Sequence, residues 1–191
     1  MSREVLRQLI HLGMCGWALL FPWIGKGGAV ALAAVAVLFN ALVFPRLPVG
    51  KRIHRETEGK WTGVQWYPVS VLGLVLALPL PLAAGAWGIL ASGDSVSNLA
   101  GRAFGTKKLP WNPRKSWAGS AAFVLAAAPV ALLLLGWNLR GEGPVEPWIL
   151  PVVLASAVAA AAESLPIRLD DNLTVALAAG ATLGLAGWVR A

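Results

Sequence analysis

The chain is dominated by apolar blocks that are long enough to cross a lipid bilayer. Seven such blocks run over residues 8–24, 27–44, 66–80, 82–103, 116–137, 146–163 and 171–189. Most of them reach the ~17–25 residues that a helix needs to span the hydrocarbon core. Their apolar residues are continuous rather than alternating, which excludes barrel strands, and only 13% of the 191 residues are charged. The sequence therefore predicts an all-α, polytopic membrane bundle of about seven transmembrane helices, in a single domain over 1–191.

The third block, 66–80, is shorter than the others. Pro79 and Pro81 in the run LPLPL interrupt helical hydrogen bonding and predict a kink or a tight turn where the block ends. Whether this block crosses the bilayer fully is a question that the sequence leaves open.

Positive charge is sorted to one side of the predicted bundle. If the N-terminus is cytoplasmic and all seven blocks cross, the cytoplasmic side holds the N-terminal tail and the loops 45–65, 104–115 and 164–170. Thirteen of the sixteen Lys and Arg residues then lie on that side or at its edge, and only Lys26, Arg140 and Arg190 lie opposite. Such a bias is typical of loops retained in the cytoplasm. It predicts an integral membrane protein whose N-terminus and basic loops face the cytoplasm, and it explains the net charge of +7 without a nucleic-acid partner.

One apolar block runs into the segment ASGDSVSNLAGRAFG, which carries charges that are costly in lipid. A helix over this segment places on one stripe Asp94, Asn98, Gly101, Arg102 and Gly105. Small residues at four-residue spacing also permit a tight contact between helices, which is the structural alternative. An ionisable residue inside a span is a functional hypothesis by default. Asp94 therefore predicts a cation or a metal as its partner.

Basic and small side chains follow this stripe on the same predicted face. They are Lys107, Lys108, Arg114 and Lys115 in the loop, then Ser116, Gly119 and Ser120 where the next block begins. Backbone N–H groups at a helix start, beside small residues and a lysine, suit phosphate oxygens. The alternative is that these charges only anchor the span near anionic lipid.

The segment ESLPIRLDDN supplies more carboxylates to the same face. Glu163 closes the sixth block, and Asp170, Asp171 and Asn172 open the seventh. Asp or Asn at a helix start is often an N-cap, and we expect this role for Asn172. Carboxylates around a basic, phosphate-binding face suit Mg²⁺, which is usually held by one or two carboxylates together with substrate phosphates. These residues predict phosphoryl chemistry on a membrane-soluble substrate.

Taken together, these segments resemble the dolichol kinase and phytol kinase family of CTP-dependent lipid-alcohol kinases, in a compact prokaryotic form. The shared motifs are Gly-Asp at 93–94, Gly-Arg-x-x-Gly at 101–105, Lys-Ser-x-x-Gly-Ser at 115–120, Glu-Ser-x-Pro at 163–166 and Asp-Asn-x-Thr at 171–174. The opening REVLRQLIHLG also resembles the family's Arg-Lys-x-x-His, with Gln8 where a lysine is usual. The resemblance covers most of residues 3–180. It implies CTP as phosphoryl donor, Mg²⁺ as cofactor, and an isoprenoid alcohol of the polyprenol, dolichol or phytol type as acceptor.

The resemblance and the residues together predict a set of roles. Asp94, Glu163 and Asp171 are expected to bind the metal and the triphosphate, with Asp170 as second choice, and Asp94 to accept the hydroxyl proton. The nucleotide and its phosphates would contact Asn98, Gly101, Arg102, Gly105, Lys107, Lys108, Lys115, Ser116, Gly119 and Ser120. Arg7, His11 and Asn172 are candidate accessory residues, and an ordinary buried histidine is the alternative for His11.

Two other functions stay open. A CTP-dependent cytidylyltransferase acting on a phospholipid would also use a nucleotide and Mg²⁺, but its Gly-Gly-x-x-Asp-Arg-x-Asp pattern is missing. A small transporter or membrane scaffold could use buried charges to bind an ion or a partner, although its polar groups would be expected near the middle of the spans. The spacing of the residues does not distinguish CTP from ATP as the donor.

Overall fold

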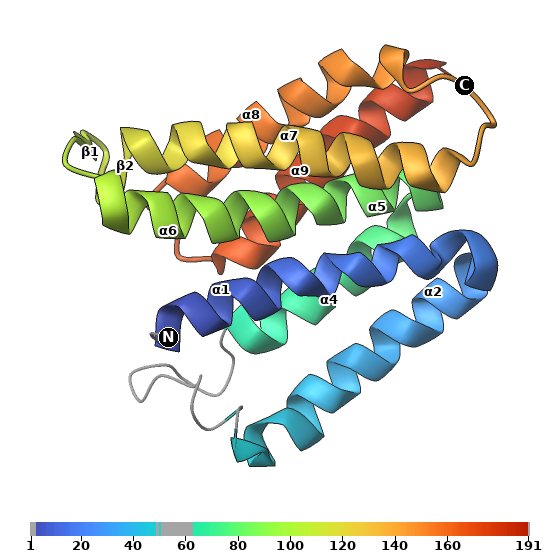
Figure 1. Ribbon diagram of the computed structural model, residues 1–191, viewed down its shortest axis with the longest axis horizontal. Coiled ribbons are helices and arrows are strands. Elements are labelled where there is room, and N and C mark those ends of the chain that lie inside the picture. The colour runs from blue at the N-terminus through green and yellow to red at the C-terminus, as the bar shows by residue number, and fades with distance from the viewer. Residues whose placement is uncertain (1–2, 49, 51–62, 191) are drawn as a thin grey trace.

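The computed structural model describes residues 3–48, 50 and 63–190, and almost all of them are helical (Figure 1). The helices are α1 (Arg3–Met14), α2 (Phe21–Leu38), α4 (Gly63–Ala77), α5 (Leu80–Gly88), α6 (Asp94–Phe104), α7 (Trp117–Leu139), α8 (Ile149–Ser164) and α9 (Asp171–Arg190). Short 3-10 segments lie at Cys15–Leu20, Phe44–Arg46 and Glu146–Trp148, and π-helical turns at Phe39–Val43 and Ile89–Gly93. The predicted all-α bundle is confirmed.

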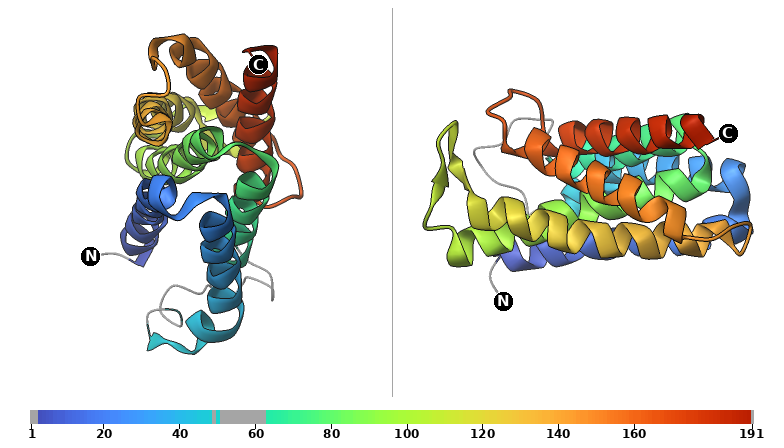
Figure 2. Two further views of the ribbon diagram at one scale, coloured as in Figure 1. Left: turned by 90° about the vertical axis from the view of Figure 1, so that its right-hand side faces the viewer. Right: turned by 90° about the horizontal axis from the view of Figure 1, so that it is seen from above.

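The N-terminal helices form a hairpin whose two arms diverge. The 3-10 turn Cys15–Leu20 extends α1, and the chain reverses at Gly25, which adopts a φ of 65° and a ψ of −176°. A side chain is strained at such a φ, so glycine suits this reversal between the first two predicted blocks. Both α2 and α9 pack on α4, and α2 lies at the edge of the bundle when it is viewed end-on (Figure 2).

The run LPLPL breaks the helix as predicted. Helix α4 ends at Ala77, and α5 begins at Leu80 with Pro79 as its N-cap residue. From Leu80 the chain stays helical through the π turn Ile89–Gly93 into α6. Asp94, the first residue of α6, therefore lies inside a continuous helical stretch and not at a free helix end. A π turn changes the direction in which the following side chains project, and such turns are frequent at functional sites.

Small residues let the central helices approach closely. Helix α7 packs against both α5 and α6, and α8 packs against α9. A Cβ atom added to Gly93 would lie 2.5 Å from the ring of Phe123, and one added to Gly88 would lie 3.0 Å from the Ala131 backbone. Without a hydrophobic driving force between helices in lipid, close van der Waals packing of this kind holds a bundle together.

One short hairpin departs from the predicted loop between the fourth and fifth blocks. Strands β1 (Lys108–Leu109) and β2 (Asn112–Ser116) pair antiparallel, with a register irregularity between Lys108 and Leu109. The predicted loop 104–115 thus contains a short hairpin, for which the sequence carried no signal. The hairpin matters because strand β2 carries Lys115.

The polar segments gather at one end of the bundle. The start of α1, the β1–β2 hairpin and the link from α8 to α9 lie together at one end, and the link from α7 to α8 and the end of α9 lie at the other (Figure 1). Length and composition would let four helical stretches cross a membrane: Glu4–Arg46, Trp117–Leu139, Glu146–Ser164 and Asp171–Arg190. The chain is therefore a membrane protein. The number of seven crossings stays a prediction, and the basic loop over 51–62 lies outside the described residues.

Candidate active site

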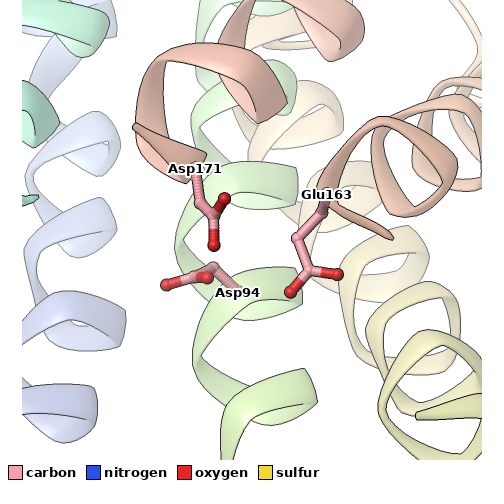
Figure 3. Close-up of side chains that lie close together, drawn as sticks. All are labelled: Asp94, Glu163 and Asp171. Carbon is pink, nitrogen blue, oxygen red and sulfur yellow. The ribbon is translucent and has the colours of Figure 1, made fainter. Parts of the chain in front are cut away.

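Three carboxylates from three helices meet at the polar end of the bundle (Figure 3). Asp94 is the first residue of α6, Glu163 lies in the last turn of α8, and Asp171 begins α9. One carboxylate oxygen from each residue lies within 4.8 Å of the others. Asp94 and Glu163 are buried, and Asp171 is exposed. The structure thus brings together the three residues that the sequence nominated first as metal ligands.

Lys115 joins two of these carboxylates. Its ammonium group contacts Glu163 Oε1 and donates a hydrogen bond of 2.8 Å to Asp171 Oδ2. Burial alone would lower the pKa of Lys115, but the negative charges of Glu163 and Asp171 outweigh it and raise that pKa above its usual value. Lys115 is therefore charged at neutral pH. With all three carboxylates ionised, one ammonium leaves the cluster with two excess negative charges.

His11 faces the third carboxylate. Its Nε2 lies 3.9 Å from Asp94 Oδ2, and its ring lies 4.0 Å, centroid to centroid, from the ring of Tyr67. The Tyr67 hydroxyl donates to the backbone oxygen of His11 at 3.0 Å and accepts a 2.7 Å hydrogen bond from Trp87 Nε1. These contacts fix the imidazole beside Asp94. His11 thus lies next to the cluster, and its accessory role stays a prediction.

Arg102 turns away from Asp94. Its Nε donates to Asn98 Oδ1 at 3.2 Å, and a second guanidinium nitrogen lies 3.4 Å from Glu4 Oε2. Glu4 also lies 3.7 Å from Arg7 Nε. Arg102, the last charged residue of the α6 stripe, is therefore paired with Glu4 of α1, which the sequence did not mark as a site residue.

The remaining basic candidates lie at the surface. Lys107, Lys108 and Arg114 are exposed around the β1–β2 hairpin, at the same end of the bundle as the carboxylates. Of the four lysines and arginines in this predicted loop, Lys115 alone reaches the carboxylate cluster among the described residues.

The predicted nucleotide-binding glycines pack helices together. The Ser116 hydroxyl caps α7 by accepting from the Gly119 backbone N–H at 3.2 Å. A Cβ atom on Gly119 would lie 3.1 Å from the Ser97 backbone oxygen, and one on Gly105 would lie 2.6 Å from Ser116 Oγ. Gly101 also faces Ser116 and Gly119. These residues form the tight α6–α7 contact that was the structural alternative, and the hydroxyl of Ser120 is buried there without a partner among the described residues.

The start of α9 corrects one expectation. The Asp170 carboxylate accepts hydrogen bonds from the Asn172 backbone N–H at 3.0 Å and from the Asn172 side chain at 2.8 Å. Asp170, rather than Asn172, therefore caps the helix, because its oxygen satisfies an N–H group of the first turn. Asp170 is not part of the carboxylate cluster found among the described residues.

Three residues near the site were missed by the sequence analysis. Ser97 donates to Glu163 Oε1 at 3.4 Å, and Tyr67 and Trp87 hold His11 as described above. Tyr67 is the single tyrosine of the chain and lies near the start of an apolar block, which was a weak signal. Ser97 had been read only as a small packing residue.

The cluster fits a divalent metal by its chemistry. Its donors are carboxylate oxygens, the ligands that hard cations prefer, and two of the three are buried where uncompensated charge is costly. The two excess negative charges of the cluster match one divalent cation. Mg²⁺ is compatible with this donor set.

Comparison with known proteins identifies the family. The chain is 38% identical over 92% of its length to "Probable phytol kinase 2, chloroplastic" of Oryza sativa subsp. japonica, and 36% identical over 98% to "Farnesol kinase, chloroplastic" of Arabidopsis thaliana. It is 29% identical over 93% of its length to "Phytol kinase 1, chloroplastic" of Arabidopsis thaliana. The chain belongs to the phytol and polyprenol kinase family.

The match to the family covers nearly all of this chain but not all of its relatives. The chain spans 64% of the rice phytol kinase, 66% of the farnesol kinase and 64% of the Arabidopsis phytol kinase, which is just under two thirds of their length. No family model matches the chain, and no solved structure matches it. The family resemblance drawn from the motifs is confirmed by whole-chain similarity to these relatives.

Proposed function

We propose that the chain is a lipid-alcohol kinase, which transfers the terminal phosphoryl group of a nucleoside triphosphate to the hydroxyl of an isoprenoid alcohol. The observation that carries this proposal is the meeting of Asp94, Glu163, Asp171 and Lys115 at the polar end of an apolar helical bundle. Relatives named phytol kinase and farnesol kinase support the acceptor class. CTP is the proposed donor, and Mg²⁺ the proposed cofactor.

The three carboxylates would hold the metal. A divalent metal held by Asp94, Glu163 and Asp171 would supply positive charge against the negative charge that develops during transfer. Lys115 holds the side chains of Glu163 and Asp171 toward each other, which fixes two ligand groups before substrate arrives. Phosphoryl transfer is mostly positioning and charge stabilisation, so a prearranged cluster of this kind is the main requirement.

Asp94 is the residue that would connect the cluster to the acceptor. It contributes an oxygen to the carboxylate cluster, and it also lines the large apolar cavity of the protein. In the proposed step, the acceptor oxygen bonds to the terminal phosphorus while the bond from that phosphorus to the bridging oxygen breaks. The hydroxyl proton passes to Asp94, and the nucleoside diphosphate leaves with the bonding electrons.

Basic side chains around the cluster would bind the rest of the nucleotide. Arg102, Lys107 and Lys108 are exposed at the same end of the bundle, where their charges can attract a polyphosphate. The glycines of the α6–α7 contact act indirectly, since they hold α6 and β2 close enough for Asp94 and Lys115 to share a site.

The proposed side of the membrane is the cytoplasmic one. This proposal rests on the predicted sorting of thirteen of the sixteen Lys and Arg residues to the cytoplasmic loops and tail. A prokaryotic inner membrane is the proposed location. The relatives above are named as chloroplastic, and the prokaryotic location is proposed from the resemblance to a compact prokaryotic form.

Labelled nucleotide tests the function directly. Purified protein in nanodiscs receives CTP or ATP labelled at the α- or the γ-phosphate, together with Mg²⁺ and farnesol or phytol. The proposal predicts a lipid product that carries the γ label and a nucleoside diphosphate. A lipid that carries the α label, with release of pyrophosphate, would indicate a cytidylyltransferase instead. No lipid product with either nucleotide would leave the transporter or scaffold alternative.

A further inference from the structure

A deep apolar cavity of about 380 Å³ lies between the two diverging arms of the N-terminal hairpin, with α4 as its third wall. Its volume is in the range of small-molecule sites, ~300–1,000 Å³. The walls are formed by Ile10, Met14 and Trp17 on one arm, by Ala29, Ala33 and Ala36 on α2, and by Pro68 and Val71 on α4. The two arms separate toward the polar end of the bundle (Figure 1).

Polar groups occur at one end of this cavity. Arg7, His11, Asp94 and Asn172 line it there, close to the carboxylate cluster. His11 Nε2 and Asn172 Oδ1 are buried and have no hydrogen-bond partner among the described residues. A buried polar atom without a partner is costly and rare in native structures. Two such atoms at the end of one apolar cavity therefore point to a ligand that brings a hydroxyl to them.

We propose that this cavity binds the isoprenoid tail of the acceptor, with the acceptor hydroxyl between His11 Nε2 and Asp94. The proposal rests on the proposed function and adds the place of the acceptor to it. His11 is a positioning residue here, since its ring is fixed by Tyr67 and its free nitrogen faces the hydroxyl. Asp94 would then face the hydroxyl from the side of the carboxylate cluster.

The length of the cavity sets the length of the tail. From His11 to Phe21, which is 1% exposed, the chain runs through the end of α1 and the 3-10 segment Cys15–Leu20, a distance of ~18 Å at rises of ~1.5 and ~2.0 Å per residue. An extended chain advances ~3.3–3.6 Å for every three backbone bonds, so ~18 Å holds about fifteen or sixteen bonds. Three isoprene units have a shorter main chain than this. A farnesol-length tail therefore fits within the cavity, and a fourth unit would extend toward Phe21.

Selectivity for the length of the tail must come from the shape of the cavity rather than from its hydrophobicity. A tail that moves from lipid into an apolar cavity gains little transfer free energy, because lipid chains are as apolar as the side chains that replace them. Narrowing the cavity should consequently act by steric exclusion and should affect long acceptors more than short ones.

The test compares two substitutions on the same helix. Ala36→Phe places a large ring in the cavity, whereas Ala31→Phe places it on the exposed side of α2, outside the cavity lining. Acceptors of one, two, three and four isoprene units are assayed with each variant. With Ala36→Phe, kcat/KM for three and four units should fall about tenfold or more, the scale on which apolar pockets discriminate single methylenes. The one-unit acceptor and all Ala31→Phe rates should stay near wild type. An equal loss for all acceptors, or no loss, overturns the proposal.

Photo-crosslinking separates this proposal from the proposed function. A farnesol analogue with a diazirine on its last isoprene unit is irradiated with the wild-type protein, and the labelled peptides are identified by mass spectrometry. The proposal predicts labels on the segment around Phe21 and Ala29, lost when excess farnesol competes. Such labels without any phosphoryl transfer would refute the kinase but keep the tail site. Phosphoryl transfer with labels only on other helices would keep the kinase and refute the tail site. This readout also holds if Ala36→Phe fails to fold.

Discussion

Lys115 should stabilise the fold as well as the site, because it is the cation between a buried and an exposed carboxylate. Replacing it by Met keeps the aliphatic stem and removes the charge. Glu163 is 3% exposed, and breaking a buried pair by removing one partner costs ~3–5 kcal/mol. The side chain of Asp171 is 48% exposed, and an exposed pair contributes only ~0–1 kcal/mol. Since the Lys115 side chain itself is 22% exposed, we expect Lys115→Met to lower the free energy of unfolding by about 2–4 kcal/mol.

A second substitution identifies the cause of that loss. Lys115→Met leaves Glu163 as a buried charge without a cation, so adding Glu163→Gln should restore more than half of the lost stability. The two changes should be non-additive, as expected for residues in contact. Lys107→Met is the matched control, since Lys107 is exposed and forms no ion pair among the described residues; its effect should stay within about 0.5 kcal/mol.

The assay is unfolding in detergent micelles with chelator present and no nucleotide, so that a bound metal does not replace the missing ammonium. Circular dichroism during titration with denaturant reports the free energy of unfolding of all four proteins. Equal stability of Lys115→Met and wild type would refute the reasoning. A double variant that is no more stable than Lys115→Met would refute it as well, because the uncompensated carboxylate would then not be the cause.

Three further predictions concern packing, capping and topology. Gly105→Ala should destabilise the fold by about 1–3 kcal/mol through overpacking, since its Cβ would lie 2.0 Å from the Gly101 backbone oxygen. Gly101→Ala should be tolerated, because its Cβ would lie 3.4 Å from its nearest neighbour. Thermal unfolding of both variants checks this, and equal effects would contradict it. Asp170→Ala should cost about 1 kcal/mol by loss of the α9 cap but keep the phosphoryl-transfer rate, and a large loss of rate would make Asp170 a ligand after all. Single cysteines at Lys108 and Glu142, in a background without the native cysteine, should react with impermeant reagent from opposite sides of the membrane, and labelling from one side would refute the assigned ends.

The sequence predicted the parts of the fold that depend on composition and local chemistry. Continuous apolar blocks predicted the helices, and Pro79 within LPLPL predicted the break before α5. Asp94 was selected because a charge is costly beside lipid, and Glu163 and Asp171 because carboxylates beside a basic face suit Mg²⁺; neither selection needed knowledge of how the helices pack. The family motifs pointed to the same three residues.

Features that depend on packing between distant segments were not predicted. Lys115 reaches Glu163 because the β1–β2 hairpin turns strand β2 toward α8, and neither strand has enough residues to give a periodic pattern. The apolar cavity depends on how the two arms of the N-terminal hairpin pack on α4, which the sequence pattern does not give. For the glycines of the α6–α7 contact the sequence left two roles open, nucleotide binding and tight helix packing, because small residues suit both; the structure shows the packing, and the binding role stays a prediction.

The central claim is that Asp94 serves phosphoryl transfer rather than the fold, and one variant tests it most directly. Asp94→Asn keeps the shape of the side chain and removes its charge. Its rate of transfer from CTP to farnesol, measured beside its thermal stability, should fall by about 10²–10³, the range found when a group that stabilises transition-state charge is removed. Its stability should be unchanged or higher, because a buried charge has been removed. A near wild-type rate for the folded variant, or lost stability with the rate intact, would contradict the account.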